Sequence, residues 1–243
     1  MKQLLFIELH KIRIQRRDMM VLSNKTPFRA IDYDKNVRKV IPLYDLICEQ
    51  IIDLISVYCG DRPISILDTG CGSGNLGLKA FQKLAVKELV LCDPSEDMLA
   101  VAKEKLRAAE CTFRQIGSEG LDYSGHFDVV TAIQSHGYFD RAGREAAVMN
   151  CCNALKDGGL FICFENTAPF TEQGRDIMLD RVFSFGINAG RTPEEAAAHR
   201  ARYGTDFFPL TIKEHLELLN KTGFGTAELF WHSYMQSGFY GIK

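Results

Sequence analysis

The sequence predicts an α/β fold built on a mixed, mostly parallel sheet with helices on both faces. Three observations carry this prediction. Short aliphatic runs alternate with helical patterns, a glycine-rich turn joins the first run to a helix, and two strand patterns close the chain. Alternation of this kind favours a parallel sheet with crossover helices. The length of 243 residues and the hydrophobic content of 46% suit a single domain with additions.

The individual elements follow from hydrophobic periodicity. Buried-strand patterns cover residues 64–69, 88–93, 112–116, 127–134 and 159–166, and two closing strands cover 226–232 and 238–243. Helical spacing covers residues 28–58, 75–85, 95–109, 141–155 and 212–222. The closing strands are joined by a short link, which predicts a terminal β-hairpin.

Two segments interrupt the alternation. Residues of about 20–60 precede the first strand and are predicted to form a helical cap over a ligand cleft. Residues of about 167–210 contain three prolines and two helical patterns, and we expect them to form a helical lid. We therefore treat residues 1–243 as one domain with a cap and a lid.

The most informative stretch is the turn that follows the first strand. Asp68 ends the strand pattern, and Gly70, Gly72 and Gly74 follow before helical spacing begins at Asn75. Glycines permit a tight turn and let the backbone approach a ligand closely. A strand, a glycine-rich turn and a helix N-terminus together predict a nucleotide-sized cradle.

The glycine spacing alone leaves the cofactor open. Residues 72–77 match the GxGxxG pattern of dinucleotide-binding folds, so a nicotinamide-linked enzyme is one alternative. Two acids favour another cofactor. Asp68 lies two residues before the first glycine, and Asp93 ends the next strand, where a carboxylate can accept hydrogen bonds from both hydroxyls of a ribose.

The order strand, Asp-x-Gly-x-Gly-x-Gly, helix, strand, Asp resembles motifs I and II of the class I S-adenosylmethionine-dependent methyltransferases. The resemblance covers nearly the whole chain. It implies a Rossmann-like, seven-stranded, mostly parallel sheet whose last strand is antiparallel, and S-adenosyl-L-methionine as the cofactor. It also implies methyl transfer to a small molecule.

Within this superfamily the layout is most similar to the carboxy-S-adenosylmethionine synthase group and related small-molecule methyltransferases. Those proteins place an Ile/Val-Pro-x-Tyr element before the first strand, here ending at Tyr44. They also place an arginine about nine residues before a Thr-x-x-x-His helix, here Arg202 before Thr211 and His215. Their glycine turn lacks the third glycine step of residues 70–74, so we expect methyl transfer rather than carboxyl transfer to the sulfonium. A carboxy-S-adenosylmethionine synthase and a non-catalytic cofactor-binding subunit remain alternatives.

The resemblance and the strand ends select the cofactor-binding residues. Asp93 is expected to bind the ribose, although it also fits a helix N-cap, and Asp68 to orient the glycine turn and the amino-acid end of the cofactor. Met98 packs on the adenine or belongs to the core, and Tyr44 reaches the cofactor carboxylate or packs its own helix. The full predicted set is Tyr44, Asp68, Gly70, Gly72, Gly74, Asp93, Met98, Ser118, Glu119 and Gln134.

Residues after the fourth strand are expected to lie near the transferred methyl group, because ligands of open α/β sheets sit beyond the carboxyl ends of the strands. His136 and Tyr138 follow that strand. Histidine is the usual general base near neutral pH, so His136 is a candidate base, with a hydrogen-bonded loop residue as the alternative. Glu165, at the end of the fifth strand, is expected to bind substrate or to tie down the loop.

Arg202 is the third candidate catalytic residue. An arginine can hold a carboxylate through two parallel hydrogen bonds, so we expect it to grip an anionic group of the substrate. In the resembled group the matching arginine reaches the site of a partner subunit, which implies a homodimer. The alternative is that residues 199–203 form a solvated basic helix face.

Composition narrows the partners. With a formal net charge of −2, we do not expect the protein to bind nucleic acid or a membrane. None of the eight cysteines forms a CxxC pair, so we expect reduced thiols in a cytoplasmic protein and no metal site. No transmembrane run is present, and residues 1–17 read as a poor signal peptide, with an upstream start or a basic surface helix as the alternatives.

Overall fold

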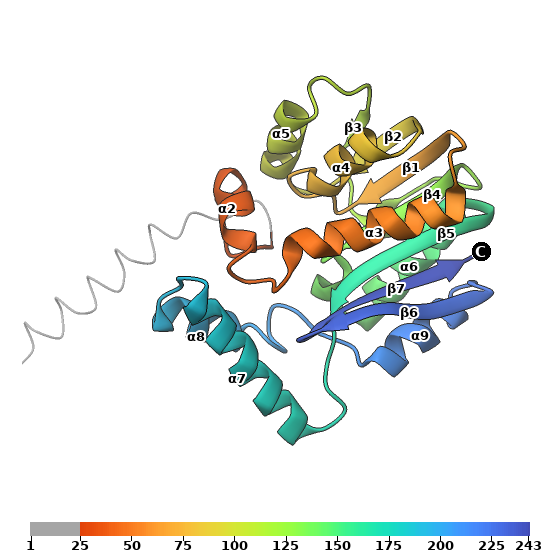
Figure 1. Ribbon diagram of the computed structural model, residues 1–243. Helices are drawn as coiled ribbons and strands as arrows, with labels where there is room; N and C mark the ends of the chain where they lie inside the picture. The colour runs from red at the N-terminus through yellow and green to blue at the C-terminus, as the bar shows by residue number, and fades with distance from the viewer. Residues whose placement is uncertain (1–24) are drawn as a thin grey trace, which may run out of the picture.

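The computed structural model describes residues 25–243, in which strands and helices alternate as predicted (Figure 1). The strands are β1 (Ile64–Thr69), β2 (Val86–Cys92), β3 (Thr112–Arg114), β4 (Phe127–Ile133), β5 (Leu155–Asn166), β6 (Thr226–Ser233) and β7 (Gln236–Ile242). The α-helices are α2 (Tyr33–Val37), α3 (Tyr44–Cys59), α4 (Asn75–Lys83), α5 (Glu96–Lys105), α6 (Arg141–Ala154), α7 (Glu172–Asn188), α8 (Pro193–Ala201) and α9 (Ile212–Lys221). Short 3₁₀ helices are η1 (Ala30–Asp32), η2 (Ser118–Gly120) and η3 (His136–Tyr138). The expectations for residues 1–17, and for the first residues of the cap, lie outside the described residues.

The seven strands form one sheet in the order β3-β2-β1-β4-β5-β7-β6. Strands β1 to β5 pair in parallel, and β7 pairs antiparallel with both β5 and β6. The predicted mostly parallel sheet with an antiparallel last strand is therefore confirmed. The chain steps outward from β1 in both directions, so β1 and β4 flank the switch point where such sheets bind their ligands.

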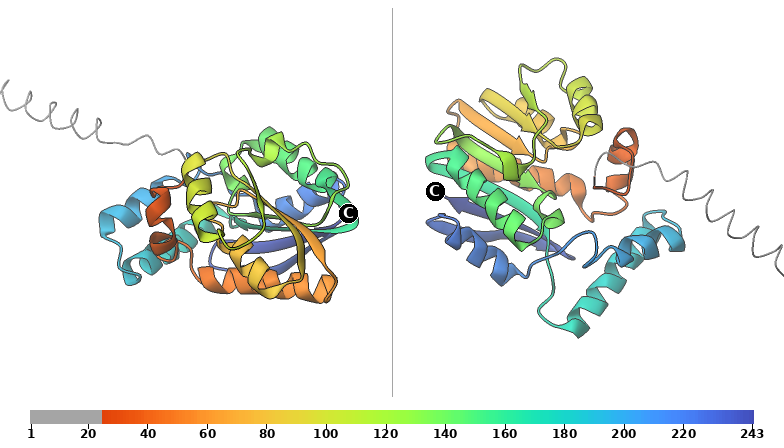
Figure 2. Two further views of the ribbon diagram at one scale, coloured as in Figure 1. Left: turned by 90° about the horizontal axis from the view of Figure 1, so that it is seen from above. Right: turned by 180° about the vertical axis from the view of Figure 1, so that it is seen from behind.

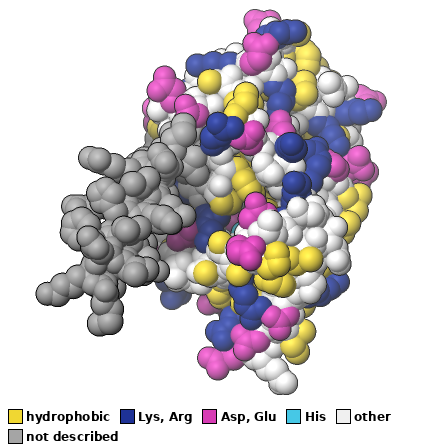
Figure 3. Space-filling view, turned by 90° about the vertical axis from the view of Figure 1, so that its left-hand side faces the viewer, with side chains coloured by type: hydrophobic (Ala, Val, Ile, Leu, Met, Phe, Trp, Pro, Cys, Tyr) yellow, Lys and Arg dark blue, Asp and Glu magenta, His cyan; other side chains and the backbone are white. Residues whose placement is uncertain are grey.

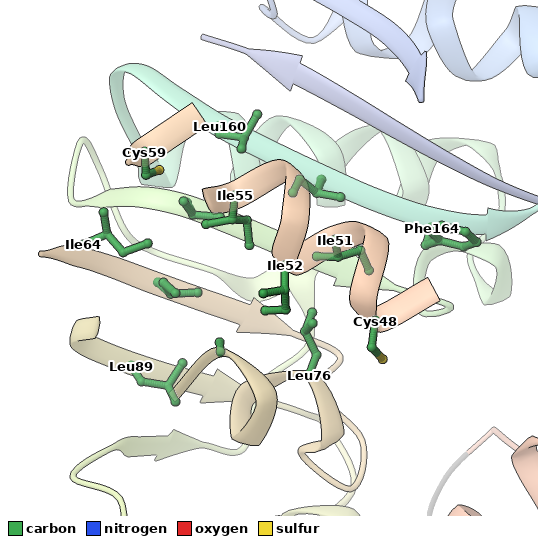
Figure 4. Packing of buried hydrophobic residues seen from close by; sticks show 14 of the residues in the cluster. Cys48, Ile51, Ile52, Ile55, Cys59, Ile64, Leu76, Leu89, Leu160 and Phe164 are labelled. Atoms are coloured by element: carbon green, nitrogen blue, oxygen red, sulfur yellow. The ribbon is translucent and has the colours of Figure 1, made fainter. Parts of the chain in front are cut away.

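Each face of the sheet has its own core, because successive side chains of a strand point to opposite faces. Val129 of β4 packs into the cluster under α3 and α4, and the next residue, Val130, packs into the cluster under α6 and α9. Figure 4 shows the first cluster, in which apolar side chains of α3 lie over the sheet. Ile51 and Ile55 of α3 are almost wholly buried there. The two cores hold the parallel strands in register and thereby fix the positions of their carboxyl ends.

Several predicted boundaries differ from the structure, and two of the differences have a clear physical cause. The single helix expected over residues 28–58 is divided, because Pro42 disfavours helical backbone at the residue before it and Leu43 takes a left-handed φ of 60° before α3 begins. Strand β5 begins at Leu155 rather than at residue 159, because Leu155 already pairs with Phe127. Gly158 and Gly159 therefore lie inside β5, in the part of the strand where its pairing with β4 shifts register.

The cap and the helical insertion meet at one end of the sheet. The carboxyl ends of the parallel strands face the side of the molecule that carries α2 and α8, and α7 extends from the body beside α8 (Figures 1 and 2). No helix in the described residues 25–243 is long and apolar enough to cross a membrane.

Candidate active site

The glycine turn after β1 is shaped by close packing and by open space. A Cβ on Gly70 would lie 2.4 Å from the Cβ of Ser135, so only glycine lets this turn approach the turn after β4. Gly72 has a φ of 54°, and a Cβ built on it would meet no atom within 4 Å. The second glycine therefore faces a space in which a ligand can approach the backbone.

Asp93 links the glycine turn to the start of α5. Its Oδ2 accepts a hydrogen bond from Gly72 N at 2.9 Å, and its Oδ1 accepts one from Ser95 N at 2.8 Å. Burial raises the pKa of this carboxyl group, and the two backbone donors oppose that shift. Carboxylate oxygens carry further lone pairs, so both can still accept from the hydroxyl groups of a ligand.

A cavity of about 250 Å³ opens beside this carboxylate, at the carboxyl ends of β1, β2 and β4. Eight of the predicted site residues line it: Gly70, Gly72, Asp93, Met98, Ser118, Glu119, Gln134 and Tyr138. Other lining residues were not predicted from the sequence, among them Tyr33 of the cap and Ser135 and Phe139 on either side of η3. The cap was expected over the cleft, but no local pattern marks Tyr33 as the residue that faces it. We call this space the first cavity.

Three predicted cofactor residues, Gly74, Tyr44 and Asp68, lie outside the lining of the first cavity. Gly74 caps α4, and its Cβ position faces Leu106 and Ala102 of the α5 region, so it is a packing glycine. The hydroxyl of Tyr44 accepts a hydrogen bond from Asn75 Nδ2 at 3.1 Å, on the outer side of the glycine turn.

That outer side carries a polar cluster that fastens the cap to the glycine turn. Asp34 of α2 accepts hydrogen bonds from Ser73 Oγ at 2.6 Å, from Asn75 Nδ2 at 2.8 Å and from Lys105 Nζ at 2.7 Å. Burial raises the pKa of Asp34, but the hydrogen bonds from Lys105 and Ser73 outweigh it and lower the pKa overall. The cap is therefore joined to α4 by a hydrogen bond and to α5 by an ion pair.

Asp68 lies beneath the turn with one of its two carboxyl oxygens hydrogen-bonded. Its Oδ1 accepts from Thr131 Oγ1 at 2.7 Å, whereas its buried Oδ2 has no partner among the described residues. Burial raises the pKa of this carboxyl group to about 7. A buried acceptor without a donor is costly, so Asp68 is suited to receive a donor group from a ligand or a bound water.

His136 points into the protein and is not among the residues that line the first cavity. Its side chain is buried, and Nε2 lies 3.0 Å from Ser118 Oγ, which lies 2.8 Å from Thr69 Oγ1. Burial lowers the pKa of the imidazole to about 3, with the charge of Arg144 as a further cause. This placement favours a neutral loop histidine over the predicted general base.

Glu165 fixes the turn that contains His136. Its carboxylate accepts hydrogen bonds from the backbone N–H groups of Ser135 at 3.3 Å, His136 at 2.9 Å and Gly137 at 3.0 Å. The guanidinium of Arg144 donates to the carbonyls of His136 and Gly137 at 3.0 and 3.2 Å. Of the two expected roles for Glu165, these contacts match the one that ties down the loop.

A second, smaller cavity of about 60 Å³ adjoins the first. Thr26, Tyr33, Gln134 and Tyr138 line both cavities, and Arg202 lines only the second. Burial raises the pKa of both tyrosine phenols. The boundary between the cavities is therefore formed by neutral hydroxyl and amide groups.

Arg202 is the C-cap residue directly after α8 and is largely enclosed, with 15% of its side chain exposed. It donates through Nε to Asp206 Oδ2 at 2.7 Å and through Nη2 to the carbonyl of Lys25 at 2.7 Å. The neighbouring Arg200 instead pairs with Asp180 of α7. The two arginines of the basic stretch thus have different environments, and only Arg202 reaches the second cavity.

The charged groups near the cavities are of both signs. Figure 3 shows the end of the molecule that carries α2, α7 and α8, where Lys and Arg side chains are interspersed with Asp and Glu side chains outside the grey region. Within the described part of the chain, no cluster of His, Cys, Asp and Glu is placed to hold a metal ion. All eight cysteines carry free thiols.

The chain is similar to a methyltransferase domain family and to carboxy-S-adenosyl-L-methionine synthases. Residues 66–159 match the model of a methyltransferase domain family. A carboxy-S-adenosyl-L-methionine synthase of Nautilia profundicola is 25% identical over 206 residues, which cover 83% of this chain and 87% of that protein.

Two solved structures share the fold. A protein of Nostoc punctiforme, proposed to be an O-methyltransferase, superposes with a TM-score of 0.65 at 19% identity, and the match covers 88% of this chain but only 60% of that one. A magnesium protoporphyrin IX methyltransferase of Synechocystis with bound S-adenosylhomocysteine superposes with a TM-score of 0.60 at 16% identity, covering 85% of this chain and 86% of that one.

Proposed function

We propose that the chain is a class I S-adenosylmethionine-dependent methyltransferase, and that it methylates a small molecule that carries an anionic group. The observation that carries the proposal is the pair of adjoining cavities at the carboxyl ends of the strands, with Asp93 in one and Arg202 in the other. Together their volumes reach the lower end of the range for small-molecule sites, which is about 300 Å³.

The residues of the first cavity fit the cofactor. Gly72 leaves room for close approach, Asp93 has lone pairs for the ribose hydroxyls, and Met98 offers an apolar surface for the adenine. Ser118 and Glu119 lie where the adenine edge is expected. When bound, S-adenosyl-L-methionine supplies an electrophilic methyl group on a sulfonium, and the lone pair of the acceptor forms the new bond as the carbon–sulfur electron pair passes to sulfur.

The protein contributes alignment rather than proton transfer. Gln134, Tyr33 and Tyr138 line both cavities, so they are placed to orient an acceptor toward the donor. Alignment of this kind lowers the activation free energy by about 7–11 kcal/mol in well-oriented systems. His136 is neutral and buried, and the phenol of Tyr138, whose pKa burial raises further above its ordinary value, stays protonated near neutral pH and can donate a hydrogen bond. We therefore propose an acceptor that is already nucleophilic, such as an anionic oxygen or a neutral amine.

A carboxy-S-adenosyl-L-methionine synthase is the second candidate function. The observation that favours it is the similarity to such proteins over most of both chains. The two functions differ in the product, because a carboxylated sulfonium keeps the cofactor sulfur charged, whereas methyl transfer leaves a neutral thioether.

The assignment is tested by incubating the purified protein with methyl-labelled S-adenosyl-L-methionine and fractions of a metabolite extract. Mass spectrometry should find the label in a small molecule, together with S-adenosylhomocysteine. A labelled, carboxylated cofactor would support the second function instead. Failure of the protein to bind either S-adenosylmethionine or S-adenosylhomocysteine in calorimetry would contradict both.

Two further proposals concern the state of the protein. We propose a homodimer, by resemblance to the synthase group, and light scattering at assay concentration tests it; a monomer would contradict it. We also propose a cytoplasmic location, which the free thiols support because such compartments keep cysteines reduced.

A further inference from the structure

Three side-chain amides form a closed ring of hydrogen bonds on one wall of the second cavity. Gln134 donates to Gln236, Gln236 Nε2 donates to Asn166 Oδ1 at 2.6 Å, and Asn166 Nδ2 donates to Gln134 Oε1 at 3.2 Å. All three residues line the second cavity, and Gln134 also lines the first. The ring therefore lies where the two cavities join.

The sheet holds this ring in place. Asn166 ends β5 and Gln236 begins β7, and the two are direct partners in the antiparallel ladder. Gln134 follows β4, and its backbone N–H donates to the carbonyl of Phe164 at 2.6 Å. Gln134 also has a φ of 55°, a left-handed conformation that residues other than glycine adopt only when their surroundings enforce it. The ring is thus built on strand ends rather than on a free loop.

The ring leaves hydrogen-bonding capacity unused. A carboxamide carries two N–H donors and an oxygen with two lone pairs. Within the ring each amide donates one hydrogen bond to one neighbour and accepts one from the other. Gln236 is buried, with 4% of its surface exposed. Buried polar capacity is costly when unmet, so the remaining donors and lone pairs are suited to a ligand group that both donates and accepts.

His199 of α8 and Arg202, which follows the helix, both line the second cavity. Arg202 brings a positive charge, and His199 brings a buried Nδ1 that has no partner among the described residues. Apolar side chains of Phe28, Val182 and Phe207 also contribute to the lining. The cavity therefore combines a cationic group, an apolar lining and a neutral group that both donates and accepts.

We propose that the amide ring of Gln134, Asn166 and Gln236 determines acceptor specificity by binding a hydroxyl-type group of a small apolar carboxylate whose charge Arg202 holds. The inference rests on the proposed function, since it assigns the second cavity to the acceptor. A hydroxyl group matches the ring because it donates to an amide oxygen and accepts from an amide N–H at the same time.

Three probes separate the contributions of the ring and of Arg202. The full chain is saturated with S-adenosylhomocysteine and titrated in a calorimeter with 4-hydroxybenzoate, benzoate and phenol. Benzoate lacks the hydroxyl group, and phenol lacks the carboxylate. We expect 4-hydroxybenzoate to bind at least about fivefold more tightly than either of the other two, which is the effect of one ordinary hydrogen bond.

The variants Gln236→Met and Asn166→Leu keep the side-chain size and remove the amide. Each should bring the affinity ratio of 4-hydroxybenzoate to benzoate close to one. Arg202→Met should weaken both carboxylates alike and keep the preference for the hydroxyl group. Gln173→Met, at an exposed amide on α7, is the matched control and should leave all three affinities unchanged.

Saturable binding of S-adenosylhomocysteine and an unchanged thermal melt show that each variant is folded. A hydroxyl preference that persists in both amide variants would overturn the role of the ring and leave the proposed function standing. So would the absence of binding by all three probes at millimolar concentration to the loaded wild-type protein. If S-adenosylhomocysteine itself did not bind, the proposed function would fail first.

Discussion

Replacing Asp93 with alanine should weaken the binding of S-adenosylhomocysteine strongly while the protein stays folded. Asp93 is buried at the edge of the first cavity and holds Gly72 N and Ser95 N at 2.9 and 2.8 Å. The same oxygens are expected to accept from the two ribose hydroxyls. The variant therefore removes the oxygens that would accept hydrogen bonds from the ribose. It also leaves the N–H groups of Gly72 and Ser95, which set the shape of the turn, without their acceptor.

The magnitude follows from the number of hydrogen bonds. A hydrogen bond to a charged group contributes about 1.5–3 kcal/mol, so two of them give about 3–6 kcal/mol. Water entering the vacated space recovers part of this. We therefore expect an increase in Kd of about 10²- to 10⁴-fold, since each 1.4 kcal/mol corresponds to a factor of ten.

Isothermal titration calorimetry with S-adenosylhomocysteine measures the effect, and thermal melts without ligand establish that the variant is folded. Asp61→Ala is the matched control, because Asp61 is exposed and precedes the amino end of β1, whereas Asp93 lies at the carboxyl ends of the strands. A folded Asp93→Ala variant with wild-type affinity would refute the assignment of the ribose site. Binding of NAD by the wild-type protein would refute the choice of cofactor.

Three further predictions concern the acceptor side and the buried acids. Arg202→Ala should raise the KM for an identified acceptor or abolish transfer, with the Kd of S-adenosylhomocysteine changed only a few-fold; an unchanged KM would leave Arg202 with a purely structural role. His136→Gln should lower kcat by less than about tenfold and remove no inflection from the pH profile, because burial lowers the imidazole pKa to about 3 and the ring is neutral throughout the assay range; a loss of about 10²-fold or more that also removed an acid limb would restore it as the base. Asp68→Asn should raise the Tm more at pH 8 than at pH 5. The Asp68 pKa is raised from 3.8 to about 7 in the folded protein, so the unfolded chain releases its proton first and stability falls as the pH rises from about 4 to about 7, by at most about 4 kcal/mol. Equal Tm changes at the two pH values would contradict this reasoning.

The local pattern of apolar and polar residues was sufficient to predict the sheet and many of the site residues. Alternation of aliphatic runs with helical spacing predicts β1 to β5 and their parallel pairing, because burial on both faces selects continuous apolar strands. The rule that ligands lie beyond the carboxyl ends of such strands then brings Asp93, Glu119 and Gln134 together, and all three line the first cavity.

Side-chain direction beyond the strand ends was decided by tertiary contacts. Periodicity specifies which face of a strand or helix is buried, but it carries no information about a turn of irregular backbone. The carboxylate of Glu165 binds three consecutive N–H groups of the η3 turn, and the turn so fixed directs His136 inward and leaves Tyr138 at the cavities. Asn75 likewise donates a hydrogen bond to the hydroxyl of Tyr44 on the outer side of the glycine turn.

The second cavity depends on contacts between distant parts of the chain. Gln134 and Gln236 are neighbours only because β7 inserts antiparallel beside β5, and the register of that ladder sets Asn166 opposite Gln236. Tyr33 reaches the same space from the cap, which Asp34 fastens to the glycine turn. The sequence by itself thus determined the sheet and the glycine turn, since these follow from short-range spacing, and its resemblance to a known family indicated the class of cofactor. The acceptor pocket arose only from the packing of segments far apart in the chain, because non-local register and side-chain direction have no short-range pattern.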